Sequence, residues 1–361
     1  MNEAKKTGLK KWLNILFIPF SFGIVAAIAF SNGELKDAWQ TLFTLKPAWL
    51  LAALGGWFSY LFFDALSLYF FFRKQGCPIR FRYAAFVSVI GFYYSNITPG
   101  ASGGQPVQIF YLSKRNVPVG VSTSAATVRL LCMQFMVVLI GLLLWLFNLP
   151  ALAPHTSGGI RWLVIIGGVI NFSAVPLILL VAFYRPPVEW LVRNGIRLGV
   201  KLRMIKNPEA LEQKAADTLD SYHKSILEVS KTPSQFFLQL FFMGASLFCF
   251  LSIPVPLYYA FGLSGTPWYI VLALSYMIFW SASYTLPPGG SGMQEGGFWL
   301  LYQGVFTSGT VGLAMLVWRF INFYLAVLTG PLLSLLFELY EKRKAAAEAS
   351  KSGEKPVEEK P

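Results

Sequence analysis

The sequence predicts an all-α integral membrane protein with about six full transmembrane helices and two opposed re-entrant helical hairpins in an inverted repeat. Three observations predict this fold class. Charged residues make up 13% of the 361 residues, against about 25% in a soluble domain. Several apolar runs reach the roughly 20 residues that cross a bilayer. Two near-copies of one Gly/Pro-rich segment interrupt two of these runs.

Six apolar segments are long enough to be full spans, and together they predict one polytopic membrane domain over residues 1–340. A polar, interfacial segment at 31–47 separates the first span from the second. After the last span, we expect the charged segment 341–361 to extend the helix and then become a disordered tail. The predicted spans are about 12–30, 48–72, 119–147, 160–184, 235–262 and 310–337.

Loop charge sets the predicted orientation. Lysines before the first span and basic residues at 342–344 place both termini in the cytoplasm. The apolar segment 83–112 lies between two basic loops, so it must enter and leave on the cytoplasmic side. The segment 268–303 must likewise return to the outer side. Each is therefore expected to be a hairpin of two half-helices, since each half reaches only about 20 Å at 1.5 Å per residue.

This orientation makes the two halves of the domain an inverted repeat. Repeat one covers about 48–147 and repeat two about 235–337, so the hairpin tips face each other near the bilayer midplane. Non-helical backbone at that depth is tolerated only where it is buried or lines a wet cavity. Between the repeats, a cytoplasmic insert at 185–234 holds nine basic and six acidic residues. It predicts either a basic amphipathic helix on an anionic membrane surface or a solvated helical hairpin.

The breaks in the two hairpins share the pattern P-G-x-S-G-x-Q, and the second follows the first by about 190 residues. Gly/Pro interruptions at corresponding positions of two halves are the best sequence indicator of a transport site. Their exposed N–H groups suit an anion such as a lipid phosphate, or the segments only close tight turns. The candidate backbone positions are Pro99, Gly100, Gly103, Gly104, Pro288, Gly289, Gly290 and Gly292.

Polar and charged side chains accompany both breaks. Each break is followed after about 30 residues by an arginine in an apolar run, Arg129 or Arg319. A charge inside the membrane is a functional candidate, and a planar guanidinium matches phosphate. The alternative is a structural ion pair. Asp64 in the second span is a candidate arginine partner or proton site. The candidate head-group residues are Arg129, Arg319, Asn96, Thr98, Ser102, Gln105, Ser291, Gln294 and Glu295.

The sequence gives little support for a metal site, a nucleotide-binding loop or nucleic-acid binding. The three cysteines are far apart and the two histidines isolated, so we expect no metal site and no cofactor. The Gly-rich segments lack the Lys-Ser/Thr of a phosphate-binding loop. The net charge of +13 is explained by basic residues in cytoplasmic loops, so we expect no nucleic-acid partner.

The segments 96–108 and 286–297, together with Arg129, resemble the two signature segments of the lysylphosphatidylglycerol synthase transmembrane-region family, also called flippase-like proteins. The resemblance covers about 10–340, and Glu295 falls on the acidic position of the second signature. It implies a bacterial or archaeal plasma-membrane protein. In its best-known members this region flips lysylphosphatidylglycerol made by a soluble aminoacyl-transferase domain. We expect no such domain here, because the longest soluble segment has about 50 residues.

We therefore expect a flippase that moves an anionic or aminoacylated phospholipid between leaflets. The alternatives are an enzyme of the phosphatidylglycerol lysyltransferase type and a membrane subunit for a separate lipid synthase. The expected partner is a membrane phospholipid, and a separate synthase and a homo-oligomer are left open. The second signature differs from the family at one place: the family more often has Thr-Pro where this chain has Leu286, Pro287 and Pro288. We therefore do not carry over the geometry of this turn from the family.

Overall fold

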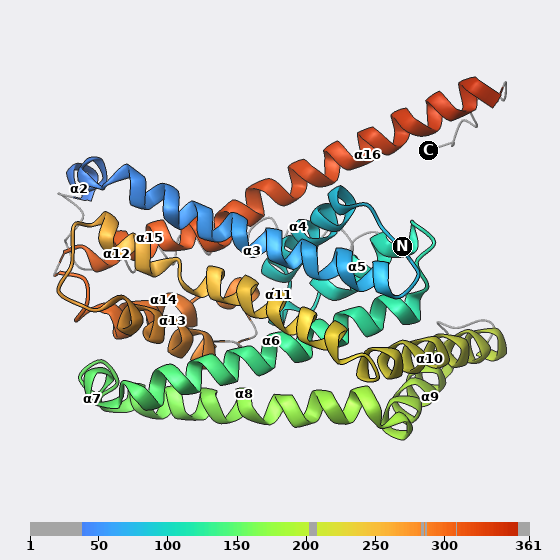
Figure 1. Ribbon diagram of the computed structural model, residues 1–361, viewed down its shortest axis with the longest axis horizontal. Helices are drawn as coiled ribbons and strands as arrows, with labels where there is room; N and C mark the ends of the chain where they lie inside the picture. The colour runs from blue at the N-terminus through green and yellow to red at the C-terminus, as the bar shows by residue number, and fades with distance from the viewer. Residues whose placement is uncertain (1–37, 202–207, 283–284, 286, 308, 353–361) are drawn as a thin grey trace.

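The computed structural model describes residues 38–201, 208–282, 285, 287–307 and 309–352, and these form an elongated bundle of helices (Figure 1). This part of the chain contains helices and turns but no β-strand, which confirms the all-α prediction. The predicted span at 12–30 lies outside the described residues.

Within the described residues, five helical stretches are long and apolar enough to cross a membrane. They agree closely with five of the predicted spans, and the protein is therefore a multi-pass membrane protein. Two are compound: α11 continues into α12, and α15 continues through the π-helical turn η4 into α16. The bounds are α3 Pro47–Lys74, α6 Val119–Phe147, α8 Gly159–Phe183, α11 Pro233–Leu251, α12 Pro254–Ala260, α15 Val311–Arg319, η4 Phe320–Tyr324 and α16 Leu325–Ser352.

Two helical hairpins lie between these long helices. In each, a 3₁₀ turn joins two short helices. Tyr83 Oη donates to the carbonyl of Tyr111 in hairpin one, and Tyr302 Oη donates to the carbonyl of Val271 in hairpin two. Both pairs of helices are thus antiparallel. Hairpin one comprises α4 Phe81–Ile97, η2 Pro99–Ala101 and α5 Gly104–Ser113, and hairpin two comprises α13 Trp268–Ala282, η3 Pro288–Gly290 and α14 Met293–Tyr302.

The two hairpins enter the bundle from opposite ends. Figure 1 shows α4 beginning near the end of α3, whereas α13 begins at the far end of the bundle, after α12. The turns η2 and η3 contact each other between these ends. The first helices of the two halves, α3 and α11, pack side by side and run in opposite directions, with Ser246 Oγ donating to the carbonyl of Tyr60 at 2.9 Å.

Hairpin two lies in the interior of the bundle. Every residue of α13 from Ile270 to Ile278 is buried, which explains why this helix is apolar around its whole circumference. Its end packs closely against two neighbours, because a Cβ added to Gly167 of α8 would lie 2.4 Å from the carbonyl oxygen of Trp280. A Cβ added to Gly141 of α6 would lie 2.4 Å from the Trp280 ring.

The remaining helices lie at the ends of the bundle. The insert consists of α9 Arg185–Lys201 and α10 Pro208–Ser230, which pack against each other, and α10 also packs on α6. This arrangement matches the predicted helical hairpin. Helix α9 also exposes Trp190 and Leu191, as expected for the other alternative, an amphipathic helix on a membrane surface. The short helices are α2 Ala38–Thr44 and α7 Leu149–Leu152. Helix α16 extends the last predicted span as expected, and 353–361 lie outside the described residues.

Close packing inside hairpin one gives a first testable prediction. A Cβ at Gly104 would lie 1.9 Å from Ser95 Oγ and 2.6 Å from the carbonyl oxygen of Gly91. Gly104→Ala should therefore destabilise the protein by about 1–3 kcal/mol, the usual cost of overpacking. Gly296→Ala in hairpin two is the control, since that site has open space. Thermal unfolding in detergent measures both, and equal melting temperatures would contradict the packing of α4 on α5.

Candidate functional site

A cavity of about 620 Å³ lies where the two hairpin tips meet. This volume is within the range of roughly 300–1,000 Å³ typical of ligand pockets. Gly100 and Gly104 of the first break and Gly289 and Gly290 of the second all line it. The two copies of the sequence motif, about 190 residues apart in the chain, therefore border one space.

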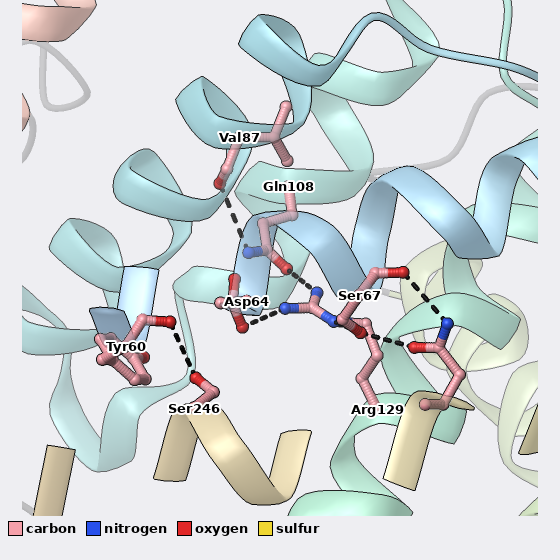
Figure 2. Close-up of polar contacts among 8 residues, drawn as sticks. Tyr60, Asp64, Ser67, Val87, Gln108, Arg129 and Ser246 are labelled. Atoms are coloured by element: carbon pink, nitrogen blue, oxygen red, sulfur yellow. Dashed lines mark hydrogen bonds and ion pairs between the residues drawn. The ribbon is translucent and has the colours of Figure 1, made fainter. Parts of the chain in front are cut away.

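Arg129 projects from α6 into a polar network at the cavity wall (Figure 2). Its Nη2 forms an ion pair with Asp64 Oδ1 on α3. Its Nε donates to Ser67 Oγ at 3.2 Å, and its Nη1 donates to Gln108 Oε1 of hairpin one at 3.4 Å. Asp64 thus takes the role of arginine partner that the sequence analysis considered.

The network around Arg129 is extended by a second layer of amides. Gln239 of α11 accepts from Ser67 Oγ at 2.5 Å and donates to the Ser67 carbonyl at 3.1 Å. Gln108 Nε2 donates to the carbonyl of Val87 at 3.4 Å. Figure 2 shows the guanidinium between Asp64, Ser67 and Gln108, with side chains from both halves of the chain around it. The arginine is therefore oriented by α3, α11 and hairpin one together.

Arg319 binds the second break more tightly than Arg129 binds the first. Its Nε pairs with Glu295 Oε1 at 2.5 Å, and its Nη1 donates to Gln294 Oε1 at 3.1 Å. Its Nη2 donates to the Gly289 carbonyl at 3.0 Å and to Ser291 Oγ at 3.4 Å. The guanidinium thereby connects α15 to both the turn η3 and the start of α14.

Glu295 is enclosed behind Arg319. Its second oxygen accepts from the backbone N–H of Gly292 at 2.7 Å, and no part of the residue is exposed. The carboxylate thus caps α14 while it neutralises the arginine, which is the structural ion pair that the sequence analysis offered as the alternative. Glu295 is not among the residues that line the cavity.

The π-helical turn η4 follows Arg319 directly. A π-turn adds a residue to the helical repeat and often occurs at functional sites. Asn322 in this turn lines the cavity together with Arg319. Thr329, one helical stretch further on, does not line the cavity, and its hydroxyl donates to the Leu325 carbonyl at 2.7 Å.

The other predicted side chains divide into two groups. Asn96, Ser102, Gln105 and Gln294 line the cavity together with Asp64 and both arginines. Thr98 and Ser291 instead stabilise the breaks: Thr98 Oγ1 accepts from Gly103 N at 2.8 Å, and Ser291 Oγ donates to the Pro288 carbonyl at 3.0 Å. Pro99, Gly103, Pro288 and Gly292 likewise shape the turns without lining the cavity.

The polar residues that line the cavity without having been predicted as head-group residues include Ser88, Gln134 and Asn322. Each is a polar residue isolated in an apolar helix, a weak signal that fits structural roles equally well. Gln134 has such a role, because its Nε2 donates to Asn171 Oδ1 at 2.8 Å and so joins α6 to α8.

The site is balanced in formal charge. Arg129 is paired with Asp64 and Arg319 with Glu295, and these residues are at most 7% exposed. A lone buried charge would cost several kcal/mol, which explains why each arginine has its own carboxylate. Among the described residues there is no cluster of three or more His, Cys, Asp or Glu that suits a metal ion.

The fold and this site define a multi-pass helical membrane protein in which two motif-bearing hairpins meet at a cavity lined by two buried arginines. The chain belongs to the family described as the lysylphosphatidylglycerol synthase TM region, whose model matches residues 12–330. This confirms the resemblance read from the two signature segments, and it relates the protein to lysylphosphatidylglycerol synthesis. No curated protein matches the chain.

The third residue of each break has a left-handed backbone conformation, which gives a second prediction. Ala101 has φ +55°, whereas the corresponding residue of the second break is Gly290 with φ +64°. A left-handed conformation costs a residue with a Cβ about 1–2 kcal/mol. Ala101→Gly should therefore raise the free energy of unfolding in detergent by about 1 kcal/mol or somewhat less. The gain is reduced because glycine loses more backbone entropy on folding than alanine does. A fall in melting temperature would show that the turn η2 is not left-handed at this residue.

The buried pair Arg319–Glu295 gives a third prediction. Arg319→Met or Glu295→Gln alone leaves the other residue without its charge partner, so each should destabilise the protein by about 3–5 kcal/mol. The double variant should lose clearly less than the sum of the two. Unfolding in detergent across this cycle measures the coupling.

The control for this cycle is the exposed pair of Arg185 and Glu189. Exposed ion pairs contribute at most about 1 kcal/mol, so Arg185→Met should have little effect. Additive losses in the buried cycle would contradict a direct interaction between Arg319 and Glu295.

Proposed function

We propose that the protein is a flippase that moves an anionic or aminoacylated phospholipid between leaflets through the cavity at the hairpin tips. One observation carries this proposal: both arginines, one from each half, line a single cavity that both motif breaks border. Intramembrane arginines are costly and mark substrate paths in many membrane proteins. Membership of the lysylphosphatidylglycerol synthase TM-region family supports a lipid as the ligand.

The proposal places the hairpins as re-entrant elements from opposite sides of the membrane. Repeat one, about 48–147, and repeat two, about 235–337, are then inverted copies. The antiparallel packing of α3 and α11 supports this, as do the opposite directions of α6 and of α15–α16 in Figure 1. In inverted-repeat transporters, one unit rocks against the other around a fixed central site. The insert 185–234 and both termini lie in the cytoplasm of a bacterial or archaeal cell in this proposal.

The hydrogen bonds of the arginines indicate how a phosphate enters. Each arginine has one carboxylate partner and one neutral glutamine partner that lines the cavity. Gln108 accepts from Arg129 at 3.4 Å, and Gln294 accepts from Arg319 at 3.1 Å. A phosphate oxygen replaces the neutral amide more readily than the carboxylate, because the amide lacks the Coulomb attraction that holds the carboxylate to the guanidinium. The ion pairs then remain while the lipid is bound.

The family description favours a second candidate, a membrane subunit that works with a separately encoded lipid synthase. A phosphatidylglycerol lysyltransferase activity of the chain itself is the enzymatic version of that candidate. Mass spectrometry of lipid extracts after expression separates these functions from transport. A new aminoacylated lipid made by the chain alone would indicate an enzyme, and co-purification with a synthase would indicate a subunit.

Leaflet-resolved translocation of fluorescent phosphatidylglycerol in proteoliposomes tests the flippase proposal. Two paired variants remove the charges without leaving an unpaired carboxylate: Asp64→Asn with Arg129→Gln, and Glu295→Gln with Arg319→Gln. Each should lower the translocation rate by about tenfold or more, because hydrogen bonds to charged groups contribute roughly 1.5–3 kcal/mol.

The control for this test is the exposed pair Arg185→Gln with Glu189→Gln, which lies outside the cavity and should translocate at the wild-type rate. If both cavity variants fold and move lipid as fast as the wild type, the proposed mechanism is wrong.

A further inference from the structure

Two buried polar atoms in the cavity wall have no hydrogen-bond partner among the described residues. They are Asn322 Oδ1, on the π-turn η4, and Ser88 Oγ, on α4 of hairpin one. Asn322 is 4% exposed and Ser88 is 1% exposed, and both residues line the cavity. Nearly all buried polar groups in proteins are hydrogen-bonded. Ten buried side-chain atoms lack a partner among the described residues, and these two are the ones whose residues line the cavity, where a ligand can supply the partner.

The chemistry of these two groups restricts that ligand. A serine hydroxyl and a carboxamide can each donate and accept hydrogen bonds. A phosphodiester only accepts, and an ammonium group only donates. A neutral hydroxyl does both, and it therefore satisfies the Asn322 amide in either orientation as well as the hydroxyl of Ser88.

The charges of the site argue against an ammonium ligand. Asp64 is held by Arg129, and Glu295 is held by Arg319 and the Gly292 N–H. Among the described residues that line the cavity, Asp64 is the only acidic one. An ammonium group would therefore find no free carboxylate among the described residues of the cavity wall, whereas a neutral hydroxyl needs none.

The rest of the cavity lining also suits a hydroxylated ligand. Carboxamides, which bind hydroxyl groups as donors and acceptors, are frequent in it: Asn96, Gln105, Gln108, Gln134 and Gln294 line it in addition to Asn322. An aromatic wall faces the same space, formed by Tyr60, Phe92 and Phe250, whose ring centroids lie 4.9–5.7 Å apart. Aromatic faces offer apolar surface for the C–H groups of a polyol or sugar.

We infer that the cavity selects a lipid with a neutral, hydroxylated head group, either a glycerol diol or a sugar ring, whose hydroxyls bind Asn322 and Ser88. This inference rests on the proposed function for the lipid nature of the ligand, and it narrows the head group. The arginines hold the phosphate where the lipid has one, whereas Asn322 and Ser88 determine specificity for the group beyond it.

Thermal-shift titrations in detergent with matched lipids test this inference. Phosphatidylglycerol and phosphatidylpropanol carry the same charge and the same three-carbon head group, but only the first has hydroxyls. The wild type should bind phosphatidylglycerol at least about tenfold more tightly, because a site built to bond a hydroxyl rejects an analogue that lacks it. Equal binding of these two lipids combined with weak binding of a monoglucosyl diacylglycerol, or tighter binding of phosphatidylethanolamine than of any hydroxylated lipid, would overturn the inference. A monoglucosyl diacylglycerol distinguishes a sugar from glycerol as the hydroxyl source, and tight binding of either supports it.

Two variants separate ligand recognition from structure. Asn322→Leu and Ser88→Ala each remove an unpartnered polar atom, so the melting temperature without lipid should stay the same or rise. The preference for phosphatidylglycerol over phosphatidylpropanol should nevertheless fall severalfold in each. Since Ser88→Ala is the smaller change, it keeps the test decisive if Asn322→Leu does not fold. Retention of the full preference in Ser88→Ala would contradict the inference.

Asn171→Leu is the matched control. The amide of Asn171 is fully bonded, donating to the carbonyls of Gly167 and Trp280 and accepting from Gln134, and it does not line the cavity. This variant should lose stability and keep the lipid preference. If the preference holds but no lipid is translocated, the inference stands and the flippase proposal fails. If lipid is translocated without any preference for hydroxyls, the flippase proposal stands and the inference fails.

Discussion

The pairing of each buried arginine with a carboxylate is the constraint on which the centre of this protein depends. Helix breaks inside a bundle leave backbone groups without their helical partners, and a buried arginine adds a charge that must be compensated. In the second half, one guanidinium addresses both problems: Arg319 pairs with Glu295 and donates to the carbonyl of Gly289 in the turn. Glu295 in turn accepts from Gly292, so the break, the hairpin and helix α15 form one unit.

The two halves use the same residue types with different connections. Arg129 takes its carboxylate from the neighbouring long helix, through Asp64 of α3, and contacts hairpin one only through Gln108. Arg319 takes its carboxylate from hairpin two itself. Hairpin two is therefore attached to its arginine by four interactions, including an ion pair, and hairpin one by a single long hydrogen bond. In its contacts to the arginines, hairpin one is therefore the less restrained of the two among the described residues.

Each buried arginine is paired with a carboxylate, so the site has no net charge, and this limits the ligands that the cavity can bind. Read as separate charges in the sequence, Arg129 and Arg319 suggest an anion site of charge +2. In the folded chain each arginine already has a carboxylate, and the neutral amides and hydroxyls that remain at the cavity wall become the groups that can discriminate between ligands. In the proposed function, affinity for phosphate and selection of the head group therefore belong to different side chains, which can be altered separately.

The sequence by itself determined the helical membrane class, five of the span positions and the two breaks, because hydropathy and Gly/Pro patterning act locally along the chain. It also identified both arginines, since a charge in an apolar run is conspicuous wherever it packs. Only the tertiary structure decided that Asp64 pairs with Arg129, that Glu295 lies behind Arg319, and that Thr98 and Ser291 support turns. The π-turn that presents Asn322, and the missing partners of Asn322 and Ser88, were equally beyond the sequence. Partners far apart in the chain, and a shift of one residue in helical register, depend on how whole helices pack, and no local pattern records that.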